Sequence, residues 1–437
     1  MRKLPVLDDK ACGIDVGSER LHVSVGGGAP EVFGTMTCDV AALVQRLLAQ
    51  GVRTVALEAT GVYWLYLYEA LEAAGIEVFV VNGRHVRNLP GRKTDMSDCQ
   101  WLATLHAHGL LRSGFVPPAH IRCLRDYMRL RQDHISMAAS HVQHMQKALE
   151  RMNVKLHDVI SDLVGVSGLK VVRAIVAGQH EPQQLLQLCD VQIRKHKAQQ
   201  VCESLRGTWR AEHLFALRQA LECWEFYQRQ IAQCDAAVAQ VLADIGGPPD
   251  AQIPAGPAKP PSANTPRIDG LHRMLVQLCG AKDPTQIPGM ADHSLLLVLS
   301  EVGTDLSKWP SPKHFTAWAG LAPGAAQSGK RRTRQARHRN RTGALFCSMA
   351  RSLCRSVDKA FGGFYRRLKS RRGGLLANKA LARKLATLFW QVMVHGIEYV
   401  EHGLRQYQER VQQSEQRLLR KLAAKLGCEL IPKKSTA

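Results

Sequence analysis

The stretch ACGIDVGSERLHVSV, residues 11–25, decides the fold of the first part of the chain. Its apolar runs Ala11–Val16 and Leu21–Val25 predict two β-strands joined at Gly17-Ser18-Glu19. Asp15 is the one charged residue in the first run. Taken alone, it is compatible with a turn residue or with the phosphate-loop aspartate of an actin-like or sugar-kinase ATPase. No adenosine-binding motif follows to favour the ATPase.

Further strands and helices alternate after this pair of strands. The predicted order is β-β-β-α-β-α-β-α. The later elements are strand Glu31–Cys38, helix Val40–Gln50, strand Thr54–Leu57, helix Val62–Ala74, strand Ile76–Val81 and helix Asp95–His108. We therefore expect an α/β domain over residues 1–115.

The next segment, residues 116–245, has a different pattern. Apolar residues recur every three or four positions from Ile121 to Leu156, interrupted only by Arg131, and again from Leu214 to Ile245. This spacing predicts two long helices with one apolar stripe each, typical of a coiled coil. The two helices could pair with one another or pair between subunits.

Residues 246–267 contain seven prolines and predict an extended linker without secondary structure. We expect a mostly helical, all-α domain over residues 268–400. A last amphipathic helix, residues 404–426, and a basic tail make up the segment 401–437.

The composition points to a polyanionic partner. The 437 residues contain 59 Lys and Arg against 37 Asp and Glu, a net charge of +22. Such a surface favours nucleic acid, with a ribosomal-type protein or a binder of anionic membranes as alternatives. No apolar run is long enough for a membrane span, and the 12 cysteines form no C-x-x-C pair. We expect a cytoplasmic protein without a zinc ribbon.

Four carboxylates in the first domain form a candidate metal site. Asp15 lies in a strand, Glu58 ends another, and Asp95 and Asp98 begin a helix on one of its faces. Clustered carboxylates repel one another unless cations neutralise them, and Mg²⁺ or Mn²⁺ prefers oxygen ligands. Two such ions can support phosphoryl transfer. Asp95 alone is also compatible with a helix cap.

A serine in basic surroundings forms the second candidate site. Ser328 is flanked by glycine, and residues 306–357 contain 11 Lys and Arg and no Asp or Glu. Ser328 is either a nucleophile that attacks phosphorus or an ordinary loop hydroxyl. The candidate nucleic-acid contacts are Lys330, Arg331, Arg332, Arg334, Arg337, Arg339 and Arg341. Gly289, in Ile-Pro-Gly-Met, is a weaker candidate for holding a phosphate in a helix-hairpin-helix turn.

Together these motifs resemble the DEDD-type insertion-sequence transposases whose recombination is guided by a bridge RNA. The likeness rests on the segments around Asp15, Glu58 and Asp95 to Asp98, and on the Ile-Pro-Gly, Ala-Gly-Leu-Ala-Pro and Gln-Ser328-Gly segments. The chain departs from the family in its Pro-rich linker, its long second helix and Ala291, where glycine is more usual.

The resemblance implies an RNase H-like (RuvC-like) N-terminal domain whose Asp15, Glu58, Asp95 and Asp98 are catalytic and bind Mg²⁺. It implies that Ser328 is the nucleophile, and that the acidic site of one subunit meets the serine of another. It further implies a homodimer or homotetramer in the bacterial cytoplasm, associated with the nucleoid, whose partners are element-end DNA, target DNA and a noncoding guide RNA. The competing hypotheses are a junction resolvase that uses water and a non-catalytic nucleic-acid-binding protein.

Overall fold

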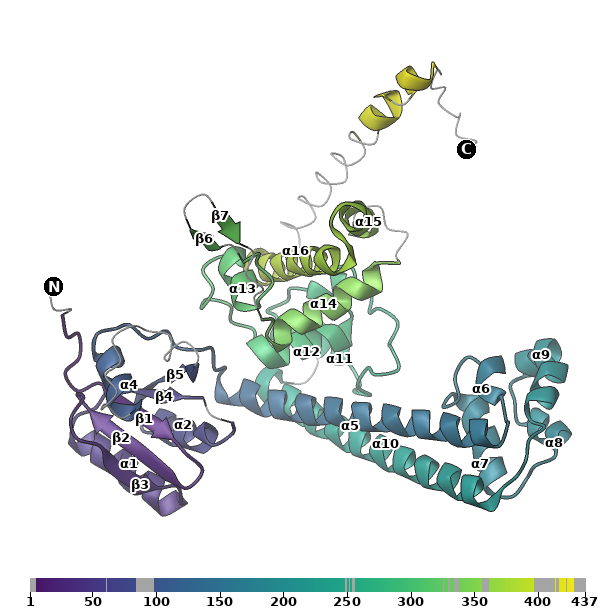
Figure 1. The fold of residues 1–437 in the computed structure, drawn as a ribbon, viewed down its shortest axis with the longest axis horizontal. Helices are drawn as coiled ribbons and strands as arrows, with labels where there is room; N and C mark the ends of the chain where they lie inside the picture. The colour runs from purple at the N-terminus through teal and green to yellow at the C-terminus, as the bar shows by residue number, and fades with distance from the viewer. Residues whose placement is uncertain are drawn as a thin grey trace. The chain divides into compact units, whose positions relative to one another are not determined.

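The chain is described by a computed structural model, in which it forms two compact units, Met1–Val116 and Pro117–Ala437 (Figure 1). The described residues are 5–59, 61–83, 98–247, 250, 252–253, 256–324, 326–328, 331–333, 338–355, 361–396 and parts of 413–427. Within the helix expected over 404–426, residues 413, 416–421 and 423–426 are helical, and the rest lie outside the described residues.

The first unit is built on a five-stranded sheet in the order β3-β2-β1-β4-β5. Strands β1, β2 and β3 are antiparallel neighbours, whereas β4 and β5 run parallel to β1. The strands are β1 Cys12–Val16, β2 Arg20–Val25, β3 Glu31–Gly34, β4 Thr54–Glu58 and β5 Glu77–Val81. This mixed sheet is consistent with an RNase H-like domain.

Helices cover both faces of the sheet. Alternate residues of β1, such as Ile14, pack into a core with α1 (Thr37–Ala49) and α2 (Trp64–Ala73). The opposite face carries α4 (Asp98–Ala107), because Gly13 leaves room there for the helix backbone. A Cβ at Gly13 would lie 2.3 Å from the Cys99 carbonyl oxygen and the Ala103 nitrogen.

The described elements follow the expected order, with one shortened strand. The strand expected over Glu31–Cys38 ends at Gly34, and α1 begins at Thr37. The Asp39 carboxylate accepts a hydrogen bond from the Met36 backbone N–H at 3.1 Å, which caps the first turn of the helix. The cap ends the strand because it fixes the helical turn that follows it.

The second unit contains two long helices, α5 (Ala119–Arg151) and α10 (Ala211–Gly246), which pack side by side within one chain (Figure 1). At 1.5 Å per residue each is about 50 Å long. The expected helix to Leu156 is wrong at its end. Asn153 has a φ of 55°, a left-handed conformation that stops the helix, and Asn adopts it more readily than most residues.

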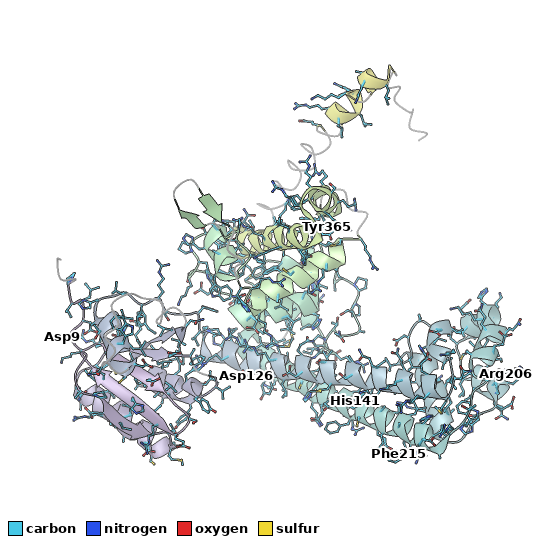
Figure 2. The ribbon with its side chains drawn as sticks, in the orientation of Figure 1. Asp9, Asp126, His141, Arg206, Phe215 and Tyr365 are labelled. Atoms are coloured by element: carbon cyan, nitrogen blue, oxygen red, sulfur yellow. The ribbon has the colours of Figure 1, made fainter. Side chains whose placement is uncertain are left out.

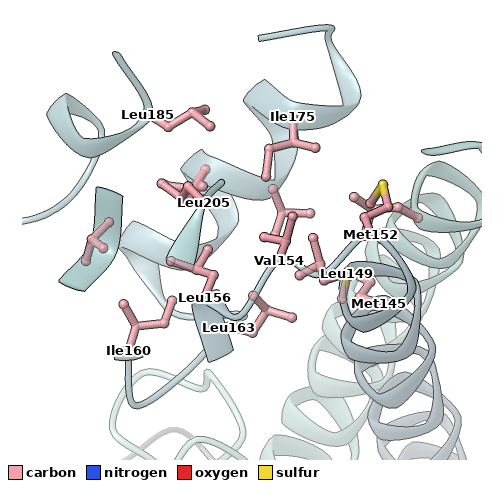
Figure 3. Packing of buried hydrophobic residues seen from close by; sticks show 14 of the residues in the cluster. Met145, Leu149, Met152, Val154, Leu156, Ile160, Leu163, Ile175, Leu185 and Leu205 are labelled. Atoms are coloured by element: carbon pink, nitrogen blue, oxygen red, sulfur yellow. The ribbon is translucent and has the colours of Figure 1, made fainter. Parts of the chain in front are cut away.

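Four short helices connect the far ends of α5 and α10: α6 Leu156–Val159, α7 Val166–Val176, α8 Pro182–Gln187 and α9 Val191–Ser204. Their apolar side chains form one core with the ends of the long helices (Figure 3). Met145, Leu149 and Leu217 contribute from the long helices, and Ile175 and Leu185 from the short ones. The apolar residues that continue the heptad pattern beyond α5 therefore belong to a small helical head formed by α6 to α9.

The rest of the second unit is mostly helical, as the sequence predicts. Its elements are α11 Leu271–Leu278, a 3₁₀ turn Pro284–Gln286, α12 Asp292–Val302, α13 Pro312–Trp318, β6 Ala326–Ser328, β7 Arg331–Thr333, α14 Arg341–Leu353, α15 Phe361–Arg372 and α16 Gly374–His395. Buried Phe315, Phe346 and Phe389 pack with ring centroids 5.8–6.2 Å apart at its centre. None of the helices described is both long and apolar enough to cross a lipid bilayer.

The Pro-rich segment has no helix or strand where it is described, as expected, but it is held against the domain. The Lys259 ammonium donates to the carbonyls of Thr285, Ile287 and Met290. Near its other end, Arg131 of α5 donates to the Asn264 carbonyl at 2.9 Å. The segment is therefore a strap fixed to the domain at several points along its length.

Arg131 is the one residue that interrupts the apolar stripe of α5, and an ion pair explains its position. Its guanidinium forms a buried ion pair with Asp235 of α10 at 2.5 Å, and Asp235 also accepts from the Arg267 backbone N–H at 3.0 Å. The pair joins the two long helices to the strap.

Candidate active site

Asp15 and Glu58 lie side by side near the carboxyl ends of the neighbouring parallel strands β1 and β4. The parallel register pairs Ile14 with Leu57, so the next residue of each strand is a carboxylate. Side chains along a strand alternate between the two faces of the sheet, and Asp15 is two residues after Gly13. Asp15 and its neighbour Glu58 therefore lie on the same face as Gly13, which is the face covered by α4. Two neighbouring parallel strands thus end with acidic groups on the same face.

Helix α4 brings Asp98 toward this edge. The Ala107 carbonyl, at the end of α4, accepts from the Leu7 N–H at 2.8 Å, just before β1 begins. The helix therefore runs opposite to β1, so its first residue, Asp98, lies toward the carboxyl ends of the parallel strands. The close contact at Gly13 fixes how near the helix lies to the sheet.

The Glu58 side chain is held by the chain that follows β5. A Cβ at Gly83 would lie 1.8 Å from Glu58 Oε1 and 2.4 Å from its Cδ. The carboxylate therefore occupies the space that any larger residue at position 83 would need. Sequence reasoning missed Gly83; the visible signal was only a glycine two residues beyond a strand.

The three described carboxylates offer oxygen donors of the kind that Mg²⁺ or Mn²⁺ binds. Asp95 lies outside the described residues. Among the described residues, the group of metal-binding side chains that approach within 4.8 Å of one another is Glu150, His157 and Asp158. It does not include the predicted site, and Lys155 already forms an ion pair with Glu150.

Ser328 is the last residue of strand β6 in a β-hairpin. It closes β6 and is paired with Arg331, the first residue of the antiparallel strand β7. Only residues 329 and 330 connect the two strands, and they lie outside the described residues. Ser328 is therefore the last described residue of β6 before this connection.

The base of this hairpin is tightly fixed. Gly320 has a φ of 71°, and a Cβ there would lie 2.3 Å from the His338 carbonyl oxygen. On the returning side, Asn340 caps α14 by accepting from the Gly343 N–H at 2.9 Å, and its amide donates to the Trp318 carbonyl. The chain that carries Ser328 thus leaves and re-enters the domain at adjoining points.

The predicted basic contacts are distributed over this region. Arg331 and Arg332 are on β7, and Arg339 and Arg341 are exposed at the hairpin base. Lys330, Arg334 and Arg337 lie outside the described residues.

Arg341 has a protein partner that the sequence did not reveal. Its Nε lies 3.6 Å from Glu301, a carboxylate only 8% exposed on α12. Arg129 of α5 donates two hydrogen bonds to Glu301 at 2.8 and 3.0 Å, and Arg125 lies 3.4 Å away. The buried Glu301 holds α5, α12 and the start of α14 together. Its sequence signal was an isolated charge in an apolar helix.

Gly289 adopts a φ of 79°, as a tight turn requires, but it is packed on protein. A Cβ there would lie 3.0 Å from Leu353. The flanking carbonyls of Ile287 and Met290 bind Lys259, and Asp292 opens the following helix. An acidic first turn is unfavourable for a phosphate at this helix. The geometry gives the phosphate-binding prediction for Gly289 no support.

Comparison with known proteins gives two matches, and each match contains one of these sites. A family model for DEDD-type IS110 transposases, described as a transposase, matches residues 12–154. A second, described as the IS116/IS110/IS902 transposase family, matches residues 285–366. Together the matches support an IS110-type transposase. The first includes all four predicted carboxylates, and the second includes Ser328 and its basic neighbours. No curated protein matches the chain.

Proposed function

We propose that the chain cuts and rejoins DNA to mobilise an insertion sequence, using Ser328 as the nucleophile and an acidic metal site in the first unit. The observation that carries the proposal is the pairing of two transposase matches with two chemically distinct sites. One match contains carboxylates that end adjacent strands, and the other contains a serine at the tip of a basic hairpin.

The acidic site would be formed by Asp15, Glu58, Asp95 and Asp98. Divalent cations held there would stabilise negative charge at the phosphate and on the departing oxygen. The chain's own contribution is positional: the β1–β4 register sets Asp15 beside Glu58, and Gly83 leaves room for the Glu58 carboxylate. The edge of a rigid sheet suits this role better than a loop.

In the proposed step, Ser328 Oγ forms a bond to phosphorus while the bond from phosphorus to one sugar oxygen breaks. The hydroxyl proton passes to a base, and the departing sugar oxygen takes up a proton, which leaves a phosphoserine ester and a free sugar hydroxyl. Rejoining reverses these events with a sugar hydroxyl of another strand. Neighbouring arginines would offset the charge that develops on the phosphate oxygens.

A noncoding guide RNA and a homodimeric or homotetrameric assembly complete the proposal. Both come from the resemblance to the bridge-RNA-guided transposases. The net charge of +22 suits an enzyme that holds both RNA and DNA.

A strand-cleavage assay tests the proposal. Wild type, Ser328→Ala and Asp15→Ala would be compared on element-end DNA with the flanking RNA and Mg²⁺. We expect both variants to lose cleavage and strand transfer. Cleavage that survives Ser328→Ala but not Asp15→Ala would instead establish a resolvase-like nuclease that uses water. Cleavage or transfer that neither substitution alters would contradict both sites.

A further inference from the structure

A cleft on the two-helix segment, far in sequence from Ser328, has the features of a ligand site. It has a volume of about 410 Å³ and lies between α5 and α10. Its lining residues are His141, His144, Lys147, Ala148, Arg151, Phe215, Ala216, Gln219, Ala220 and Cys223. On each helix they recur every three or four positions, so they form two facing stripes.

The hollow arises from small side chains beneath large ones. Ala148 and Ala220 are 3% and 5% exposed and form the floor, where larger apolar residues would fill the seam. Phe215 stands at the rim with 65% of its surface exposed. Figure 2 labels Phe215 on α10 and His141 on α5. A largely exposed phenyl ring beside a cleft is costly to leave in water and suits stacking against a flat ligand.

The polar groups of the cleft are cations and imidazoles. Lys147 and Arg151 are exposed on α5, and no carboxylate belongs to the described lining. His141 stacks on Tyr227 with ring centroids 5.6 Å apart and meets the His144 ring edge-on at 5.4 Å. Its Nδ1 is buried without a hydrogen-bond partner among the described residues. The ring is half-buried, and its Nε2, which is not buried, is the nitrogen left for a ligand in the cleft to bond.

We propose that this cleft binds one unpaired nucleotide of a single-stranded nucleic acid. The base stacks on Phe215, one of its polar edges bonds His141, and the flanking phosphates lie against Lys147 and Arg151. Aromatic faces beside cations are the general means by which proteins hold unpaired strands. The α10 half of the cleft lies outside both matched segments. This proposal rests on the proposed function only in that it takes nucleic acid as the ligand.

Cys223 gives a native reporter inside the cleft. The full chain would be alkylated with iodoacetamide, with and without saturating uridine or deoxythymidine oligonucleotide, and the modified peptides quantified by mass spectrometry. Cys38 and Cys123 are exposed elsewhere and serve as internal controls. We expect the oligonucleotide to slow the alkylation of Cys223 several-fold and to leave the two controls unchanged. Equal alkylation of Cys223 under saturated binding would overturn the proposal.

Affinity measurements locate the contacts. Phe215→Ala should weaken oligonucleotide binding by roughly 5- to 150-fold, the range for loss of one base–aromatic stack. Met137→Ala, an exposed apolar residue of α5 outside the cleft, should not. Lys147→Ala with Arg151→Ala should lower the salt slope by about 1.4. Arg229→Ala, at an exposed arginine of α10 outside the cleft lining, should leave the slope unchanged.

Preference for one of the two oligonucleotides would show whether RNA or DNA is the occupant. Circular dichroism would verify that each variant is folded. Unchanged affinity in a folded Phe215→Ala variant would sink the idea. Neither Ser328 nor catalysis enters these measurements, so failure of the recombinase proposal would leave their outcome unaffected.

Discussion

The carboxylate of Glu58 occupies the space above Gly83, where a Cβ would lie 1.8 Å from its Oε1. Glu58 is the last residue of β4, and Gly83 follows β5, the neighbouring strand. The orientation of Glu58, a predicted metal ligand, thus depends on position 83 having no side chain. This relationship links the sheet register to the proposed chemistry.

Gly83→Ala should therefore displace the Glu58 carboxylate and lower DNA cleavage by roughly 10- to 100-fold, the usual cost of disturbing a ligand's support. The fold should persist, because the displaced group is a flexible side chain. The measurement is the cleavage rate as a function of Mg²⁺ concentration. Gly363→Ala is the matched control, since a Cβ there meets nothing within 4 Å. Equal rates in the two variants would show that Glu58 does not act from this position.

The buried Arg131–Asp235 pair should dominate the stability of the junction between the long helices. Asp235→Ala leaves a guanidinium that is 3% exposed without its carboxylate, so we expect a loss of about 3–5 kcal/mol in urea unfolding. Glu225→Ala, which breaks the more exposed pair with Arg173, should cost less than about 1 kcal/mol. Similar losses in both variants would contradict the assigned role.

Lys259 should be what holds the middle of the Pro-rich strap. Its ammonium satisfies three carbonyls around Ile287, so Lys259→Ala removes the anchor and leaves those carbonyls without their donor. We expect proteolysis within 256–267 to become faster while the helices stay resistant. Lys170→Ala, at an exposed lysine of α7, tests for a general effect of lost charge. A cleavage rate equal to wild type would mean that other contacts suffice.

His293 should make the second unit sensitive to acid. Burial first, and then the nearby Arg131, lower the pKa of His293 from 6.5 to about 4. The unfolded chain therefore binds a proton at a higher pH than the folded chain. Stability should fall as the pH drops from about 6.5 to about 4, by up to about 3 kcal/mol. His293→Gln should remove this part of the pH dependence in urea unfolding. An identical slope in the variant would assign the dependence to other groups.

The sequence predicted the elements of the first unit because short apolar strands alternate there with amphipathic helices. It placed Asp15 within one strand and Glu58 at the end of another, and the register then set them side by side. It could not reveal Gly83, because the contact joins residues from two neighbouring strands. The sequence also predicted too long a helix after Ile121. The apolar spacing continues past Asn153, although the residues beyond it belong to a separate group of short helices.

Tertiary contacts account for the other differences. The strap has the composition of a free linker, and contacts with residues distant in sequence, such as the Ile287 carbonyl and the Asp235 carboxylate, show why it is fixed. The same holds for Arg341, whose partner Glu301 comes from another helix. The glycine that follows Ser328 suggested a loop, but backbone pairing with Arg331 makes Ser328 the last residue of a strand.

The most direct test of the central claim is the identity of the residue joined to DNA. Wild-type protein would react with element-end DNA, flanking RNA and Mg²⁺, and the denatured adduct would be digested and sequenced by mass spectrometry. The proposal predicts a nucleotide ester on the peptide that contains Ser328, absent in Ser328→Ala and in Asp15→Ala. Cleaved DNA with no protein-linked nucleotide, or a nucleotide on a different residue, would contradict it.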